Sequence, residues 1–180
     1  MIHQRSLADT PFAGDDGQAD PVLRARLAAA AGGAADDYLR AVAELCTARL
    51  LVPVVATATV EGRTVAGLAT DKEAEMAVVL LQTPDGRRAM VAFTGMDALT
   101  AWNAEARPVP VTLDIAAGSA RQEHAEALLI DLGGPHPLVL DGAVLQQLAE
   151  GHRLVEVAGG QFGWAVPADP DPGPEPGTDG

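Results

Sequence analysis

EMAVVLLQTPDGRRAMVAFTGMDALTAW, residues 75–102, is the stretch that decides the fold of this chain. Two apolar runs flank a short turn sequence, and the start of a helix follows the second run directly. Residues 76–81 and 89–93 are apolar at every position, which is typical of strands that are covered on both faces. The stretch therefore predicts a buried β-hairpin that leads into an amphipathic helix, and hence a domain that contains both helices and strands.

The turn residues and the helix-start residues of this stretch support the same prediction. In the turn at residues 83–86 (TPDG), proline presets φ at the second position and glycine accepts the positive φ that lets the strands resume pairing. Residues 94–97 (TGMD) have the form of a capping box, with aspartate in place of the usual glutamate or glutamine. The helix that follows is predicted to continue to about residue 105 and to bury Leu99 and Trp102.

Further helices and strands are predicted on both sides of this hairpin. Asp20 followed by Pro21 combines an N-cap with proline at the first helical position, so a helix begins there. Other helices are predicted over residues 35–50, 113–123 and 141–151, and strands over residues 51–56, 109–111, 127–132, 137–140 and 162–166. Residues 57–72 fit an edge hairpin and a long loop equally well. The predicted fold class is α+β, a single domain with a mixed sheet of about 5–7 strands and helices covering both faces.

Length and composition predict one domain with loose ends. The chain has 180 residues, of which 48% are hydrophobic, and this is enough to build one complete core. Residues 1–19 are polar and lack periodicity, so they are interpreted as a flexible N-terminal arm that precedes the domain at residues 20–167. Residues 168–180 contain four prolines and four acidic residues and are interpreted as a disordered acidic tail.

Charge and cysteine content restrict the expected partners and location. The 12 basic and 25 acidic residues give a formal charge of −13. Nucleic acids and anionic membranes both bind basic surfaces, so neither is an expected partner. The single cysteine allows no intramolecular disulfide, and no stretch reads as a signal peptide or a membrane span, so the predicted location is the cytoplasm. Eleven of the basic residues are arginine, which we interpret as the usage of a high-GC genome such as that of an actinobacterium.

The order of these motifs resembles the SseB protein family. The motifs are an acidic approach at residues 71–75, the PDGR turn, the run ending in AFTG, a helix with LTAW, and later ALLIDLGGP and LVLDG before a helix of LQQLA type. The resemblance covers about residues 50–151 and corresponds to the N-terminal domain of the family. Some members carry a second, C-terminal domain, where this chain has a short extension and tail. The resemblance supplies no catalytic residue, because no agreed biochemical activity is attached to the family.

The reactive side chains are scattered along the chain. No pair of histidines has the close spacing of a zinc site, although His124 and His136 could meet across a hairpin. Cys46 lies on the apolar face of the second predicted helix, where burial disfavours the thiolate, and is interpreted as structural. The paired carboxylates are interpreted as favourable charges in a first helical turn or as solvated faces. We therefore predict no catalytic residue, no metal site and no cofactor.

Four residues remain as candidates for an interaction or ligand site: Trp102, Thr94, Asp131 and Gly133. Asp131 follows a buried strand just before a Gly-Gly pair, and strand ends beside glycine loops are where α/β sheets place ligands. An aspartate that caps its own turn explains the same sequence. Tryptophan is enriched at interface hot spots, but the helical spacing of Trp102 also fits a core position.

The favoured function is a non-catalytic, cytoplasmic interaction or regulatory module that binds another protein or forms a homo-oligomer. This hypothesis depends on the absence of convergent reactive residues from a chain that has a complete core. The alternative is a small-molecule-binding domain or small enzyme, with its site at the strand ends near Asp131, Gly133 and Thr94. A polar pocket with carboxylates of strongly shifted pKa would favour the alternative, whereas an apolar patch around Trp102 would favour the interaction module.

Overall fold

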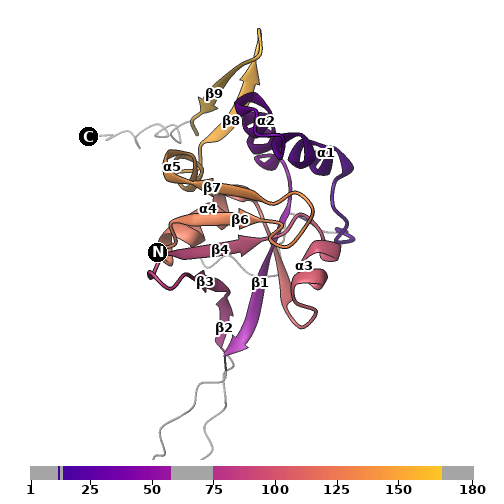
Figure 1. Ribbon diagram of the computed structural model, residues 1–180, viewed down its shortest axis with the longest axis vertical. Coiled ribbons are helices and arrows are strands. Elements are labelled where there is room, and N and C mark those ends of the chain that lie inside the picture. Colours follow the sequence, from indigo (N-terminus) through magenta and orange to yellow (C-terminus); the bar gives the residue numbers. More distant parts are fainter. Residues whose placement is uncertain (1–11, 13, 58–74, 168–180) are drawn as a thin grey trace, which may run out of the picture.

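The computed structural model describes residues 12, 14–57 and 75–167, and in these ranges the chain forms five helices and nine strands (Figure 1). The helices are α1 (Pro21–Ala30), α2 (Ala35–Leu45), α3 (Met96–Trp102), α4 (Leu113–Gln122) and α5 (Gly142–Ala149). The strands are β1 (Leu50–Thr57), β2 (Glu75–Val78), β3 (Leu80–Gln82), β4 (Arg88–Ala92), β5 (Arg107–Val111), β6 (Ala127–Ile130), β7 (Leu138–Asp141), β8 (Arg153–Val157) and β9 (Gln161–Ala165). Residues 58–72, for which the sequence left a hairpin and a loop open, and the predicted tail lie outside the described residues.

Seven of the strands form two sheets that meet at one point. A three-stranded antiparallel sheet has the order β2-β1-β5, and a four-stranded sheet has the order β3-β4-β6-β7, in which β4 and β6 are parallel. The sheets are joined where Leu51 and Phe93 form an antiparallel bridge, with both N–H···O distances at 2.8 Å. The strands are thus mixed in direction and carry helices on both faces, which confirms the predicted α+β class.

The TPDG turn has the conformation that its residues predict. The Thr83 N–H donates to the Arg87 carbonyl, and the Gly86 N–H donates to the Thr83 carbonyl, both at 2.9 Å. Gly86 has φ of +88°, a value that residues with a Cβ rarely adopt. The chain therefore reverses between β3 and β4 at the predicted position.

The strand predicted over residues 75–82 is two strands, separated at Val79. β2 pairs with β1 in the three-stranded sheet, whereas β3 pairs with β4, with Leu81 opposite Ala89. Both parts are strands with apolar residues, so the sequence stays apolar from residue 76 to residue 81 across the break. The break arises because the chain passes from one sheet to the other at Val79. No local sequence pattern indicates this change of sheet.

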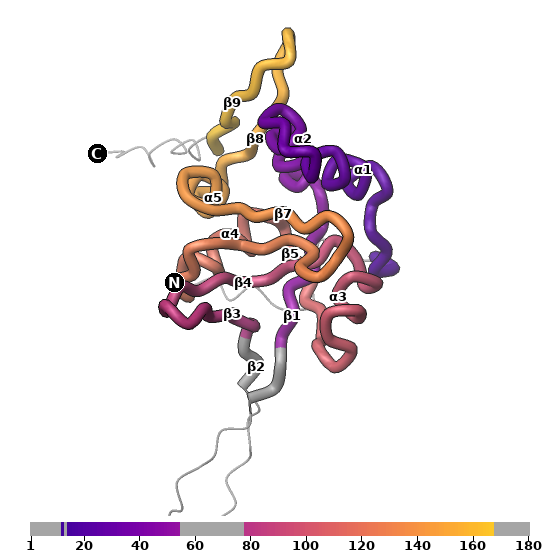
Figure 2. Tube along the Cα trace, viewed as in Figure 1, coloured from indigo at the N-terminus to yellow at the C-terminus, as the bar shows by residue number. Residues whose placement is uncertain are grey.

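One face of the four-stranded sheet is covered by α1, α2, α4 and α5. Leu128, Ile130 and Leu140 point to this face and are completely buried. Alanine and leucine side chains of the four helices pack against them, among them Leu27, Ala41, Leu45, Ala116, Ala117, Leu145 and Leu148. Figure 2 shows β4, β6 and β7 side by side. This face holds most of the hydrophobic core.

The other face of the sheet is covered only at one end. There α3 packs Leu99 and Trp102 against Phe93, whose ring centroid lies 5.4 Å from that of Trp102. Beyond this helix, Leu129 is half-buried and Val139 retains 47% of its accessible surface. Part of this sheet face is therefore open to solvent, although the strands are apolar on both sides.

The last two strands form a separate hairpin, of which only β9 was predicted. β8 and β9 pair antiparallel and project from the body of the protein in Figure 1. β8 carries one buried residue, Leu154, while Val155 and Val157 are exposed. Of β8, Leu154 reaches the main core, and the strand sequence RLVEV lacks the alternation of apolar and polar residues that is typical of a half-buried strand.

We predict that the two sides of the four-stranded sheet respond differently to truncation. Leu128→Ala should lower the free energy of unfolding by about 2–5 kcal/mol, because it leaves a cavity in a closed core. Val139→Ala, on the opposite face of the neighbouring strand, should cost well under half as much. Urea unfolding followed by circular dichroism measures both values. Equal losses would contradict the open face.

Candidate functional site

Asp131 is the most deeply buried charged residue among those that the structure describes, with 3% of its surface exposed. It follows β6 and has φ of +50°, in the left-handed region that aspartate tolerates better than most residues. Its Oδ1 accepts from the Thr94 N–H at 2.8 Å, and its Oδ2 accepts from the Thr94 hydroxyl at 2.7 Å. The side chain therefore does not cap its own turn, which is closed by the Gly134 N–H donating to the Asp131 carbonyl at 2.9 Å.

Thr94 is not the N-cap of α3, so the predicted capping box is wrong. The N-cap is Gly95, and it makes no side-chain capping bond. The Thr94 hydroxyl instead accepts from Arg24 Nε at 2.7 Å and donates to Asp131. A capping hydroxyl must accept from a helix amide, but the Thr94 oxygen accepts from the charged Arg24 Nε, which is a stronger donor than a neutral amide. The distant partner thus outcompetes the local one.

Two arginines from different parts of the chain complete this group. Arg24 of α1 places Nε 3.4 Å from Asp131 Oδ2, and its Nη2 donates to Asp97 Oδ1 at 2.8 Å. Arg49, just before β1, donates from Nη1 to the Thr94 carbonyl at 3.1 Å. We call these five residues, Asp131, Thr94, Arg24, Asp97 and Arg49, the Asp131 cluster.

The Asp131 cluster also holds residues 14–19, which the sequence assigns to the N-terminal arm. Arg49 Nη2 donates to the Gln18 carbonyl at 2.8 Å and to Asp15 Oδ1 at 3.0 Å. Arg49 Nε lies 2.9 Å from Asp15 Oδ2, an ion pair without the angle of a hydrogen bond. The Met96 N–H donates to the Gly17 carbonyl at 2.8 Å. Gly17 therefore lies against the start of α3, and Asp15 and Gln18 are held by Arg49.

Chemically, the Asp131 cluster is closed. Both carboxylate oxygens of Asp131 are already bonded, and the two guanidinium groups are occupied by protein acceptors. A hollow of about 300 Å³ beside it is lined by Asp15, Gln18, Arg49 and Thr94 among others, and the buried Arg49 Nε, which makes no hydrogen bond, is held there by its ion pair with Asp15. The cluster cross-links α1, β4 and β6 rather than presenting reactive groups.

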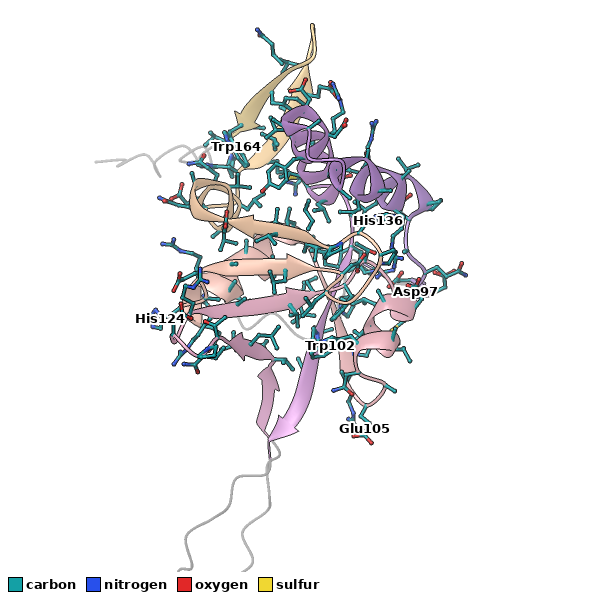
Figure 3. All side chains as sticks on the ribbon, viewed as in Figure 1. Asp97, Trp102, Glu105, His124, His136 and Trp164 are labelled. Carbon is teal, nitrogen blue, oxygen red and sulfur yellow. The ribbon has the colours of Figure 1, made fainter. Side chains whose placement is uncertain are left out.

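The four sequence candidates have different surroundings. Thr94 and Asp131 are brought into direct contact. Gly133 lies in an exposed turn with φ of +82°, and no other part of the protein approaches it. Trp102, labelled in Figure 3, is half-buried and packs against Phe93.

A larger cavity lies at the opposite end of the sheet, where β4 and β6 begin. The side chains of Leu81, Ala89, Ala127 and Asp141 form one row across β3, β4, β6 and β7, because each is the pairing partner of the next. This row, together with Leu129, lines part of a groove of about 840 Å³ at the beginning of these strands, and the part toward the helix-covered face is lined by Gln82, Arg88, Arg121 and Leu145. The hollow arises where the two central strands carry alanine and α3 no longer covers the sheet.

Charged side chains surround this row. Arg87 and Arg88 come from the turn and first residue of β4, and Arg121 comes from the last turn of α4. His124 and Glu126 lie on the connection into β6, where His124 has φ of +58°. We call the whole site the arginine groove. Sequence reasoning missed it because its lining comes from separate segments that contain no recognisable motif.

The three histidines of the described ranges do not converge on a metal site. His124 lies at the arginine groove, and His136 lies on the opposite side of the molecule in Figure 3, so the two do not meet across a hairpin. His152 Nδ1 is 2.7 Å from Gln147 Oε1. Over residues 12, 14–57 and 75–167, no group of three or more possible metal ligands gathers.

Cys46 caps the C-terminus of α2 and is half-buried against the main core. Burial raises the pKa of its thiol above the ordinary value, while a backbone hydrogen bond at Leu154 lowers it to a smaller extent. The thiolate is the reactive form, so this thiol is poorly suited to act as a nucleophile.

The match to a known family covers both sites. The family model described as SseB protein N-terminal domain matches residues 23–147. The chain belongs to the SseB family. The matched segment of this SseB protein begins in α1, earlier than the resemblance at residue 50, and ends in α5. Neither a curated protein nor a solved structure matches the chain significantly.

The helices give one further result. Within the described ranges, none combines the length and the apolar character that crossing a membrane requires.

We predict that Thr94→Val destabilises the protein by about 1–3 kcal/mol, because Arg24 and Asp131 each lose a buried hydrogen-bond partner. Thr100→Val, an exposed change on α3, should alter the free energy of unfolding by less than about 0.5 kcal/mol. Denaturant titration of both variants checks this, and a loss of similar size at the two positions would count against the cluster as a cross-link.

We also predict that Cys46 is alkylated slowly in the folded protein. At mildly alkaline pH, iodoacetamide should modify it many times more slowly than in guanidinium chloride, because its raised pKa and burial keep it as a shielded thiol. Mass spectrometry over time measures both rates. Similar rates would mean that the thiol is accessible and ionised.

Proposed function

We propose that this SseB protein is a non-catalytic, cytoplasmic protein-interaction module and that the arginine groove is its binding surface. One observation carries the proposal: a groove at the beginning of the strands combines three half-buried apolar residues, Leu81, Ala89 and Ala127, with three arginines. Soluble proteins seldom leave contiguous apolar surface exposed unless it serves recognition.

The composition of the arginine groove supports a protein partner. Leu81 and Leu129 are half-buried, and Val139 beside them is exposed, so a partner could remove further apolar area from water. Arginine is enriched at protein interfaces, where its guanidinium combines packing with directed hydrogen bonds. Arg88 and Arg121 are both exposed at the rim.

A small-molecule site at the strand ends near Asp131 has less support. Ligand sites present a few convergent polar groups to a cavity. In the Asp131 cluster these groups are bonded to one another, and Gly133 lies apart in its exposed turn. A nucleic-acid partner is disfavoured by the formal charge of −13.

Site-specific photo-crosslinking in the source cells tests the proposal. Benzoylphenylalanine at Gln82, in the groove, and at Val139, on the sheet face that carries Leu129, should each give a discrete adduct with a protein. The same group at Ala28, an exposed position on α1, should give none. Identical products at all three positions, or no product at Gln82 and Val139, would contradict the proposal.

A thermal-shift screen of metabolites tests the alternative. A compound that raises the melting temperature of the wild type, but not that of Thr94→Val, would favour a small-molecule site at the Asp131 cluster.

A further inference from the structure

The two main sheets end in three outer edges, formed by β5, by β7 and by β3 with β2. The edge of β5 is closed to a further strand. Leu51 of β1 bonds to Phe93 on the side away from β5, so the alternation of an antiparallel ladder directs the backbone of its pairing partner, Pro110, outward. Pro108 takes the next outward position on β5, and neither proline has an N–H to donate.

The edge of β7 is closed as well. Tyr38 of α2 donates its hydroxyl to the Val139 carbonyl at 3.2 Å, so the backbone groups of Val139 point away from β6 and toward α2. The next outward position, toward the start of the strand, is occupied by Pro137, which has no N–H. Prolines and covering elements are the usual means by which proteins prevent further pairing at a sheet edge.

The edge of β3 has neither kind of protection. The Thr83 N–H donates to the Arg87 carbonyl, on the side of β4. Backbone groups alternate in direction along a strand, so those of Leu81 also point to β4, whereas those of Leu80 and Gln82 point away from it. Figure 1 shows β3 at the margin of the four-stranded sheet, and among the described residues no strand pairs beyond it.

Resting on the proposed function, we infer that a partner protein binds by adding an extended segment to this edge of β3. An edge strand offers N–H and C=O groups that an extended chain can pair with in register. Leu80 and Gln82 each present one donor and one acceptor, so the added strand gains about four backbone hydrogen bonds. The recognised feature is an extended backbone that has free N–H groups at alternate residues and therefore no proline there.

The arginine groove continues from this edge and receives the side chains of the added strand. Gln82 lies on the edge and also lines the groove, together with Leu81 and Thr83. Leu81 is half-buried on the partly open sheet face, and β3 is the outermost strand there. An apolar side chain of the added strand, placed beside Leu81 on the same face, would cover its outer flank.

A single extended segment fits this edge better than a second copy of the chain. β3 has three residues, and the chain changes sheet at Val79, so the edge is short. Two such edges related by a two-fold axis would pair antiparallel, and each groove would then lie beside the start of the other β3. A segment from another protein can instead pair with β3 and continue into the groove.

Peptides enriched from a random phage-displayed library on the full-length chain provide the probe. Each is synthesised with one N-methyl group at successive positions, which removes a single N–H and leaves the side chains unchanged. Methylation at every second residue of the paired part should weaken binding about tenfold or more, because only alternate N–H groups face β3. The intervening positions should change the affinity little. Fluorescence anisotropy measures each affinity.

Two variants and one exchange measurement test the same edge from the side of the protein. Gln82→Pro removes an outward N–H, as Pro108 and Pro110 do on β5, and should weaken peptide binding about tenfold. Gln82→Ala keeps the N–H and should bind nearly as tightly as the wild type. Melting temperatures confirm that both variants are folded. In the wild type, bound peptide should slow amide exchange, measured by NMR, at Leu80 and Gln82 but not at Leu81, which pairs with β4.

Other outcomes would overturn the inference. A library that yields no binding peptide, or peptides in which methylation has no effect or acts at every third or fourth residue, would exclude strand addition and leave the interaction module intact. Self-association of the full chain that Gln82→Pro disrupts would assign the edge to a second copy. Failure of the proposed function is distinguished by the absence of crosslinks at Gln82 and Val139 in cells.

Discussion

The buried carboxylate of Asp131 is the interaction on which the arrangement of this protein depends. Desolvating a charge is costly unless hydrogen bonds and an opposite charge compensate for it. Here Thr94 supplies two hydrogen bonds, and Arg24 supplies the charge. Because Thr94 follows β4, Asp131 follows β6 and Arg24 belongs to α1, these bonds fix the first helix to the carboxyl ends of the two central strands. Arg49 extends the same cross-link to residues 14–19.

With the helices held in this way, the two faces of the four-stranded sheet become unequal. Four helices cover one face, whereas α3 covers only the end of the other near Phe93. The polar groups differ between the two ends of the sheet. At the end near α3, the side chains of the Asp131 cluster bond to one another. At the other end, Arg88 and Arg121 are exposed to solvent. An SseB protein without converging reactive groups in the described residues can thus still possess a chemically distinctive surface.

Local signals predicted the elements well where the cause was local. The TPDG turn and the Asp20 cap both form, since each depends on residues adjacent in the chain. The capping box at Thr94 fails because Arg24 donates to the oxygen that a cap would offer to a helix amide, while the hydroxyl donates to Asp131, which follows β6. Thr94 and Asp131 were recognisable as strand-end residues, but their contact was not predicted. The arginine groove was missed, because Arg88 and Arg121 become neighbours only when α4 packs on the sheet.

By itself, the sequence determined the α+β class, the reversal at residues 83–86 and the lack of a local catalytic or metal motif, since hydrophobic periodicity and turn chemistry act over a few residues. Only the tertiary structure decided that the apolar run at residues 75–82 divides between two sheets and that part of one face stays open. The physical reason is that an apolar residue in a strand indicates a preference for burial, but it does not indicate which neighbouring helix or strand will cover it. That choice depends on how far each helix reaches across the sheet.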